Sequence, residues 1–144
     1  MAVTISEPKT AEDFEGCYDL RWRILRKPWG QPMGSEKDGL EHDAIHVMAR
    51  LKGRVVGTGR IHFNSESEAQ LRYMAVEESL RGAGIGTLIL DGLEGKAREK
   101  GAKVVVANAR DNALGFYKKR GYAVLEEGKT LFGSVKHWKI QKMV

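Results

Sequence analysis

The chain has 144 residues, of which 42% are hydrophobic and 30% are charged, and its formal net charge is +5. This length and composition are typical of one globular domain, residues 1–144, and exclude a disordered chain. No apolar run approaches the roughly 20 residues of a membrane span, and the first ten residues lack the pattern of a secretory signal. Cys17 is the only cysteine, which excludes an internal disulfide and is typical of a cytoplasmic protein.

The positive charge is distributed along the chain, for example through 96–103 and 118–122, and is not gathered in one block. A small anionic ligand accounts for such an excess as well as a nucleic acid does, so charge alone does not decide. No helix-turn-helix, zinc or RNA-recognition motif accompanies the charge. The sequence therefore predicts neither a nucleic-acid partner nor a membrane partner.

The first third of the sequence predicts a short strand, a long helix and a loop. The strand covers 4–9, and the helix covers 10–26 with Thr10 as its N-cap and acidic residues in its first turn. Apolar residues at intervals of three and four mark the buried stripe of this helix: Phe14, Cys17 or Tyr18, Trp22 and Leu25. Residues 27–43 hold two of the three prolines and three glycines, which predicts a loop.

The rest of the sequence alternates strands with helices. Residues 44–63 predict two strands around the tight turn 51–54, and a polar loop at 64–69 leads to a third strand at 70–76. A helix follows over 87–101, with Leu88, Leu93 or Ile89, and Ala97 as its apolar stripe. The next segment, 103–109, predicts a strand with valines buried on both faces. A helix over 110–121 and two antiparallel strands at 122–127 and 135–143 complete the chain. This order predicts an α/β (α+β) fold, a mixed sheet with helices packed on it.

Arg81 and three glycines, Gly82, Gly84 and Gly86, lie between the third strand and the following helix. The first N–H groups of a helix lack intrahelical partners and attract anions, and glycine lets the backbone approach phosphate oxygens closely. The spacing is neither the dinucleotide fingerprint nor the Walker loop, because the third glycine comes one position early and no Lys-Ser/Thr pair follows. The segment therefore predicts a phosphate-binding turn, with a tight turn that binds no ligand as the alternative.

The pattern Arg81-x-x-Gly84-x-Gly86 resembles the acetyl-CoA pyrophosphate loop of the GCN5-related N-acetyltransferase (GNAT) family, in its small bacterial form. Residues 108–124 are similar to a second motif of that family, N-x-x-A-x-x-F-Y-x-K-x-G-F, through Asn112, Ala113, Phe116, Tyr117, Lys119, Gly121 and Tyr122. The resemblance is strong from about residue 70 to residue 124. It implies the acyl-CoA N-acyltransferase fold, a mixed and mostly antiparallel central sheet with one splayed parallel strand pair, flanked by helices.

The resemblance also implies an activity, transfer of the acetyl group of acetyl-CoA to a primary amine by direct attack in a ternary complex. The cofactor would lie between the strands predicted at 70–76 and 103–109. Its pantetheine and sulfur arm would meet Met74, Ala75, Val76, Asn108, Asn112 and Tyr117. Its diphosphate would meet Arg81, Gly82, Ala83, Gly84, Ile85, Gly86 and the hydroxyl of Thr87.

The chemistry of this transfer requires a base and an acid. A lysine-like amine, with a pKa of ~10.4, is protonated at pH 7 and must lose its proton, whereas the departing thiolate must gain one. Tyr117 is the candidate acid, because a phenol stays protonated at neutral pH. Glu68 and His62 are the candidate bases, against the alternatives of a solvated carboxylate and an ordinary strand histidine. His137, on a late strand, is a further candidate of the same kind.

Two alternatives complete the expectations from the sequence. His42 and His46 do not converge on a strand or a loop, so no metal is expected. An acyl-CoA-binding regulatory module of the same fold, without turnover, is the alternative function. The acceptor amine, the physiological acyl group and the oligomeric state are left open, with a homodimer as one option.

Overall fold

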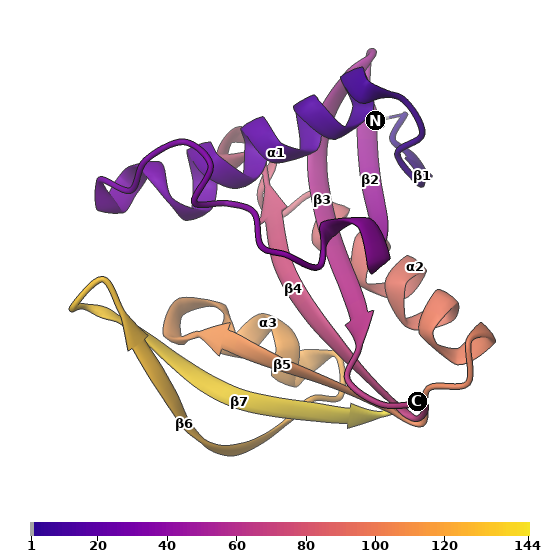
Figure 1. The fold of residues 1–144 in the computed structure, drawn as a ribbon, viewed down its shortest axis with the longest axis vertical. Helices are drawn as coiled ribbons and strands as arrows, with labels where there is room; N and C mark the ends of the chain where they lie inside the picture. Colours follow the sequence, from indigo (N-terminus) through magenta and orange to yellow (C-terminus); the bar gives the residue numbers. More distant parts are fainter. Residues whose placement is uncertain (1) are drawn as a thin grey trace.

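Seven strands form one sheet in the computed structural model, which describes residues 2–144 (Figure 1). Their order across the sheet is β1-β2-β3-β4-β5-β7-β6. The strands are β1 (Thr4–Ser6), β2 (Ile45–Leu51), β3 (Arg54–Phe63), β4 (Glu68–Val76), β5 (Val104–Arg110), β6 (Ala123–Leu131) and β7 (Val135–Met143). All neighbours are antiparallel except β4 and β5, which run parallel. The predicted mixed, mostly antiparallel sheet with one parallel pair is confirmed.

Three α-helices and four short 3₁₀ turns connect the strands. The helices are α1 (Ala11–Leu25), α2 (Ile85–Glu99) and α3 (Leu114–Lys119), and the turns lie at Lys27–Trp29, Glu41–Asp43, Glu78–Leu80 and Asp111–Ala113. Thr10 caps α1 as predicted, because its hydroxyl accepts a hydrogen bond from the backbone N–H of Asp13 while the Asp13 carboxylate accepts one from the N–H of Thr10. Gly101, with a φ of +96°, follows the end of α2 as predicted.

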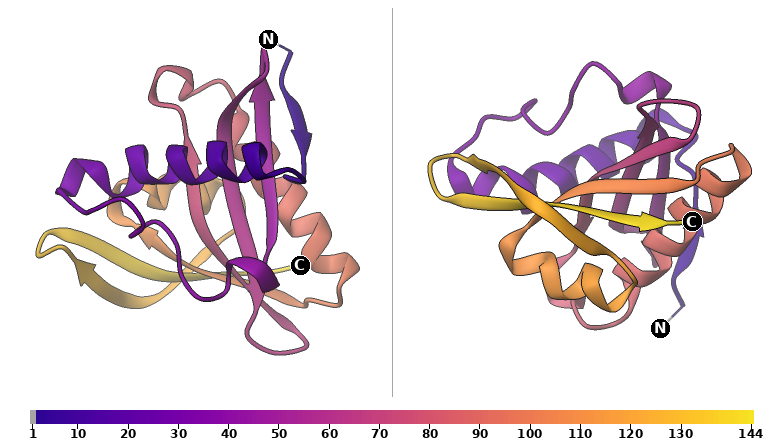
Figure 2. Two further views of the ribbon diagram at one scale, coloured as in Figure 1. Left: turned by 45° about the horizontal axis from the view of Figure 1, so that its top comes forward. Right: turned by 90° about the horizontal axis from the view of Figure 1, so that it is seen from below.

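Helices α1 and α2 cover opposite faces of the sheet (Figure 2). On β3, a side chain at Gly57 or Gly59 would collide with Ile89 of α2, so these glycines allow α2 to lie close to the sheet. Arg60, the next residue of β3, points to the opposite face of the sheet, where it donates a hydrogen bond to Glu41 in the segment that follows α1. Helix α3 lies on the α2 side, where the ring of Phe116 would lie 3.2 Å from a Cβ at Gly86.

The parallel pair β4 and β5 separates partway along its length. Its paired residues run from Glu68 opposite Val104 to Leu71 opposite Ala107, and no pair follows although both strands continue. In Figure 1 the two strands diverge into a V, with β1 to β4 in one arm and β5 to β7 in the other. The sheet is therefore open at the carboxyl ends of these two strands.

A β-bulge lies in β4 where the separation begins. Thr58 pairs with Ala75 and Arg60 pairs with Arg72, so two residues of β4, Tyr73 and Met74, face one residue of β3. Tyr73 has a φ of +56°, a left-handed conformation that costs a non-glycine residue about 1–3 kcal/mol. The bulge turns the end of β4 and changes which of its side chains face α1.

Several expected burial patterns are wrong in detail. In α1 the predicted Cys17 is buried, but its buried companions are Leu20 and Arg21, whereas Phe14, Tyr18, Trp22 and Leu25 of the predicted stripe are half-buried. In α2, Leu88 is exposed, and the apolar stripe comprises Ile85, Ile89, Leu90, Leu93 and Ala97. Of the three valines in β5 only Val105 is buried, whereas Val104 and Val106, on the other face of the strand, are half-buried.

A polar cluster beneath α1 explains why an arginine replaces an apolar residue in its stripe. Arg21 and Arg60 are both fully buried and both donate hydrogen bonds to the Glu41 carboxylate at 2.9 Å. Arg60 also binds both oxygens of Asp38, at 2.7 and 3.0 Å. The charge and hydrogen bonds of Arg21, with those of Arg60, outweigh burial and lower the pKa of Glu41. The 27–43 segment is thereby fixed to the sheet by ion pairs.

We expect Glu41→Gln to destabilise the protein strongly, because the amide keeps the shape but leaves two buried guanidinium groups without their shared charge. The loss should be roughly 3 kcal/mol, the scale for removing one partner of a buried ion pair. In thermal unfolding this corresponds to a fall in Tm of roughly 10 °C. Asp43→Asn, at an exposed residue of the same 3₁₀ turn, is the control and should leave Tm unchanged. Equal Tm values for the two variants would contradict this account of the cluster.

Candidate functional site

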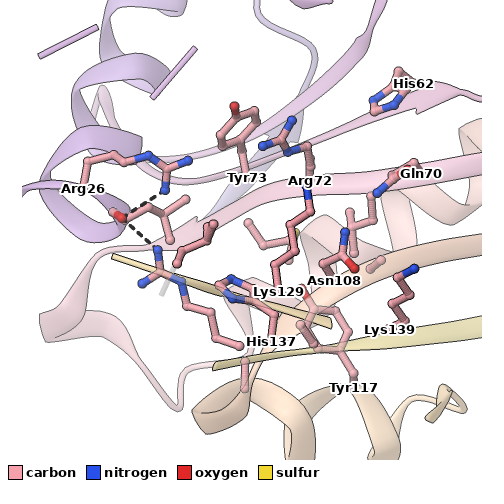
Figure 3. A pocket seen from close by; sticks show the side chains of 18 of the residues that line it. Arg26, His62, Gln70, Arg72, Tyr73, Asn108, Tyr117, Lys129, His137 and Lys139 are labelled. Atoms are coloured by element: carbon pink, nitrogen blue, oxygen red, sulfur yellow. Dashed lines mark hydrogen bonds between the residues drawn. The ribbon is translucent and has the colours of Figure 1, made fainter. Parts of the chain in front are cut away.

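A cavity of about 460 Å³ lies in the open end of the V (Figure 3). Its walls come from β4, β5, β7, the end of α1 and α3. The predicted residues Met74, Asn108, Tyr117 and His62 line it, whereas Glu68 and Asn112 do not. The fold thus brings the end of β4 and the second signature segment, residues 108–124, to one cavity, whereas none of residues 75–87 lines it.

The cavity has two different faces. Asn108 pairs with Lys139 and Arg110 pairs with His137 across β5 and β7, so these four side chains share one face. That face lies on the α1 side, because the Arg110 guanidinium stacks 4.5 Å from the ring of Trp29, in the segment after α1. Tyr117 reaches the cavity from α3, on the opposite side of the sheet. The residues that line the cavity therefore come from both faces of the sheet.

Tyr117 is buried and lacks a hydrogen-bond partner for its hydroxyl within residues 2–144. Its ring packs edge-to-face against Phe116 and Tyr122, at centroid distances of 5.1 and 5.5 Å. Burial raises the pKa of the Tyr117 hydroxyl, which therefore stays protonated well above neutral pH. The side chain offers an O–H donor to whatever occupies the cavity.

The glycine loop is an open cradle at the N-terminus of α2. Gly82 and Gly84 have φ values of +83° and +85°, and a Cβ at either position would meet no atom within 4 Å. Gly84 is the N-cap of α2 and provides no side-chain cap. Since the first intrahelical bond joins the Leu88 N–H to the Gly84 carbonyl, the N–H groups of residues 85–87 have no partner within the helix. An anion is the natural partner for these donors.

Gly86 serves a different purpose from the other two glycines. A side chain there would press against the ring of Phe116, so Gly86 is required for the contact between α2 and α3. The same contact brings Arg120, whose position the sequence did not single out, to the loop. Arg120 donates to the Thr87 hydroxyl at 2.8 Å and stacks 3.9 Å from the ring of Phe116. Arg120 and Arg81 thus place two cations near the cradle.

The two bases expected from the sequence occupy different environments. Glu68 is the first residue of β4, at the closed end of the V, and its carboxylate accepts a hydrogen bond from Asn64. His62 lines the cavity, but its Nδ1 accepts a hydrogen bond from the buried Arg60 at 3.0 Å. In that arrangement the proton of a neutral His62 lies on Nε2, which leaves no free lone pair on the ring.

His137 has the opposite arrangement of its ring nitrogens. Its Nδ1 donates to the carbonyl of Val135 at 3.0 Å, so Nε2 carries the lone pair in the neutral ring. The side chain lines the cavity and is largely buried. Burial, together with the charge of Arg110, lowers the pKa of His137 below its ordinary value of 6.5. A neutral imidazole with a free nitrogen is a proton acceptor at pH 7.

The two histidines of the metal alternative lie in different environments. His42 is exposed, whereas His46 is buried and its Nε2 binds the carbonyl of Glu41 at 2.8 Å. Across the described chain, no three histidine, cysteine or acidic side chains are grouped in a way that could hold a metal ion. None of the helices in this part of the chain has the length and apolar character that crossing a membrane requires.

The fold is that of the acyl-CoA N-acyltransferases, as comparison with solved structures shows. The structure of ElaA from Escherichia coli superposes with a TM-score of 0.84 at 16% identity, over 98% of this chain and 99% of that one. A GNAT family acetyltransferase from Elizabethkingia anophelis, solved with acetyl-CoA bound, gives a TM-score of 0.79 at 16% identity, over 99% and 98% of the two chains.

Sequence comparison identifies the family. The model of the acetyltransferase (GNAT) family matches residues 14–122. The uncharacterized N-acetyltransferase YjcF of Bacillus subtilis is 31% identical over 134 residues, which cover 93% of this chain and 95% of that protein. The chain belongs to the GNAT family and is an acetyl-CoA-dependent N-acetyltransferase.

We expect Gly84→Asn to weaken acetyl-CoA binding without unfolding the loop. Asparagine tolerates the positive φ of Gly84, but its side chain would extend into the open cradle. Calorimetry should show the Kd for acetyl-CoA rising by about tenfold or more, while the Tm of the free protein changes little. Gly53→Asn is the matched control, since Gly53 also has a positive φ and open surroundings but lies in the β2–β3 turn. An unchanged affinity in Gly84→Asn would place the diphosphate elsewhere.

Proposed function

We propose that this enzyme transfers the acetyl group of acetyl-CoA to a primary amine by direct attack within a ternary complex. The observation that carries the proposal is the unpaired O–H of buried Tyr117, in a cavity at the point where β4 and β5 separate. The two faces of the cavity suit such a complex, since the cofactor and the acceptor would approach from opposite sides of the sheet. The domain that performs this reaction would comprise residues 1–144.

The chain provides groups suited to each part of the cofactor. The N–H donors of residues 85–87, with Gly82, Ala83 and Gly84, would surround the diphosphate, and Arg81 and Thr87 would border it. The backbone of residues 74–76 and the side chain of Asn108 would face the pantetheine across the V. Asn112 is exposed in the 3₁₀ turn before α3 and outside the cavity lining, so it would meet the sulfur arm only where the cofactor extends beyond this cavity.

The residue that donates a proton and the residue that accepts one would lie on opposite faces of the cavity. The amine nitrogen attacks the thioester carbonyl, a C–N bond forms, the C–S bond breaks, and one proton must leave the nitrogen while the sulfur gains one. Tyr117, on the cofactor side, would give its proton to the leaving sulfur. A backbone N–H near Met74, in the bulge of β4, would donate to the carbonyl oxygen as charge develops on it.

Among the candidate bases, the hydrogen bonds favour His137 over His62 and Glu68. His137 has a free Nε2 on the α1 side of the cavity, where the acceptor would bind. The lone pair of His62 is occupied by Arg60, and Glu68 lies outside the cavity lining. His137 would therefore accept the amine proton directly or through one water.

Compartment and assembly stay predictions. A cytoplasmic setting rests on Cys17, the one cysteine of the sequence, which is buried and free. Homodimer formation is one open option, and the expected absence of nucleic-acid and membrane partners rests on the lack of a binding motif and of a long apolar run in the sequence.

Tyr117→Phe tests the acid. The change removes one hydroxyl without a hydrogen bond in the protein, so stability should change by about 1 kcal/mol or less. If Tyr117 protonates the sulfur, kcat should fall by roughly 10²-fold, with acetyl-CoA affinity within a few-fold of wild type. Tyr18→Phe, at a half-buried tyrosine of α1 away from the cavity, should keep full activity. Wild-type kcat in Tyr117→Phe would make Tyr117 a packing residue. Binding of acetyl-CoA without turnover of any amine by the wild type would instead support the regulatory module.

His137→Gln tests the base through the pH profile. Because the pKa of His137 is lowered, its ring is neutral at pH 7 and gains a proton only below pH 6.5, where kcat/KM of the wild type should fall. The groups that face the ring are the guanidinium groups of Arg110 and Arg26, which lower its pKa, and the backbone of Val135 and Lys129, which raises it. His137→Gln should lower kcat/KM by roughly 10- to 100-fold and abolish this acidic limb. His62→Gln, the control, should keep the limb. The reverse result would assign the base to His62.

A further inference from the structure

The wall of the cavity on the acceptor side is strongly cationic. The cavity lining contains five arginine and lysine side chains, Arg26, Arg72, Arg110, Lys129 and Lys139, and no aspartate or glutamate. Arg72 and Lys139 pair with Asp38 and Glu126 outside the lining, whereas the other three have no such partner within residues 2–144. A site for a polycationic amine would be expected to carry acidic side chains, because like charges brought together in a partly buried site repel one another. The charge of this wall therefore constrains the acceptor.

Arg26 and Arg110 form the centre of this wall. Arg26, the residue after α1, is only 8% exposed, and Arg110 at the end of β5 is half-buried. Both guanidinium groups donate to the same acceptor, the carbonyl of Leu25, at 3.1 and 2.8 Å (Figure 3). Burial and the neighbouring charge of Arg26 lower the pKa of Arg110 to about 10. Two cations thus share one neutral oxygen.

The contrast with the deeper arginines is informative. Arg21 and Arg60 are matched by the carboxylates of Glu41 and Asp38, whereas no carboxylate of residues 2–144 lies within 4 Å of Arg26 or Arg110. Desolvating a guanidinium group without a counter-ion is costly. A ligand that brings its own negative charge would remove this cost on binding.

We propose that the acceptor is a primary amine that carries a carboxylate or phosphate group, and that this acidic group binds between Arg26 and Arg110. The proposal rests on the proposed acetyl transfer and specifies its substrate class. Arginine suits this role, since its planar guanidinium binds carboxylate and phosphate through two parallel hydrogen bonds. Carboxylate and phosphate both suit this pair of cations.

The register of the sheet connects this anion site to the chemistry. Arg110 and His137 are direct cross-strand neighbours on the same face, with side chains about 5 Å apart at their Cβ atoms in such pairs. An acidic group at Arg110 would therefore leave the amine of a small acceptor near His137. It would also shield His137 from the two cations that lower its pKa, so acceptor binding would make this ring a stronger base.

The cofactor has a separate cationic region. Its expected diphosphate cradle lies at the N-terminus of α2, on the opposite face of the sheet from α1 and the segment after it, where Arg81 and Arg120 are found. Arg110 stacks on Trp29, on the α1 side. The two arginine pairs therefore serve different ligands, which an experiment can separate.

The test compares amines that carry an acidic group with related amines that lack one. Initial rates of thiol release from acetyl-CoA are measured with three pairs of amines: β-alanine and β-alaninamide, glutamate and glutamate diamide, and O-phosphoethanolamine and ethanolamine. Spermidine is included as a polycationic amine. We expect kcat/KM for the acidic member of at least one pair to exceed that of its neutral partner by tenfold or more. The carboxylate and phosphate pairs separate the two sources of the anion.

Variants then connect the preference to the arginines. Arg110→Gln should raise the KM for the acidic acceptor, so that the ratio of kcat/KM for the acidic acceptor to kcat/KM for the neutral one falls to near one. Arg110→Lys, which keeps the charge, should restore part of this ratio. The KM for acetyl-CoA should change less than threefold in both. Arg54→Gln removes the same charge from an exposed residue of β3 and is the control for long-range electrostatics. It should retain the full preference.

A binding measurement keeps this proposal separate from the activity. Calorimetric titration of the same amine pairs into the protein with coenzyme A should show tighter binding of the acidic member, lost in Arg110→Gln. Such binding without any turnover would uphold the anion site and overturn the proposed acetyl transfer. Turnover that is equal within each pair, or a preference unchanged in Arg110→Gln, would overturn the anion site alone. So would an Arg110→Gln variant whose main defect is a weakened affinity for acetyl-CoA.

Discussion

The site depends on the separation of β4 from β5 after the pair Leu71–Ala107. A parallel ladder normally satisfies the N–H and C=O groups of both strands, and buried groups without partners cost about 1–3 kcal/mol each. Beyond Ala107 the facing edges of the two strands have no strand partner within residues 2–144, while their outer edges pair with β3 and β7. The V thus exposes backbone donors and acceptors to a ligand, and side chains from both faces of the sheet converge around them.

Two features keep the V open. The bulge at Tyr73 turns the end of β4 away from the direction it would need to continue the ladder. The Tyr73 ring then lies among four arginines, Arg21, Arg26, Arg60 and Arg72, at 4.5 to 5.7 Å from their guanidinium carbons. The negative face of an aromatic ring attracts such cations. The strained residue Tyr73 is therefore stabilised by the contacts of its side chain as well as by the pairing of β4 with β3. Its φ is favourable only in this packed context.

The sequence predicted what depends on local chemistry. Thr10 indicated the start of α1, the glycines indicated the loop before α2, and the two motifs together indicated the parallel pair. The buried stripe of α1 was wrong because hydrophobic periodicity cannot anticipate that Arg21 is buried beside Glu41, twenty residues away. His137 could not be distinguished from His62 either. The difference between them is which ring nitrogen is occupied, and that depends on Arg60 and the Val135 carbonyl.

The distribution of charge follows one rule from the interior to the cavity. Where the arginines are fully buried, the chain provides the carboxylates, because a cation without a partner there would destabilise the fold. At the cavity wall, Arg26 and Arg110 are given a carbonyl and aromatic rings but no acid. The same rule leaves Tyr117 without a partner for its hydroxyl and His137 with a free nitrogen. Each of these side chains lines the cavity between the diverging strands. The charges and hydrogen-bonding groups that the fold leaves without a partner are therefore those that a bound acceptor and cofactor would satisfy.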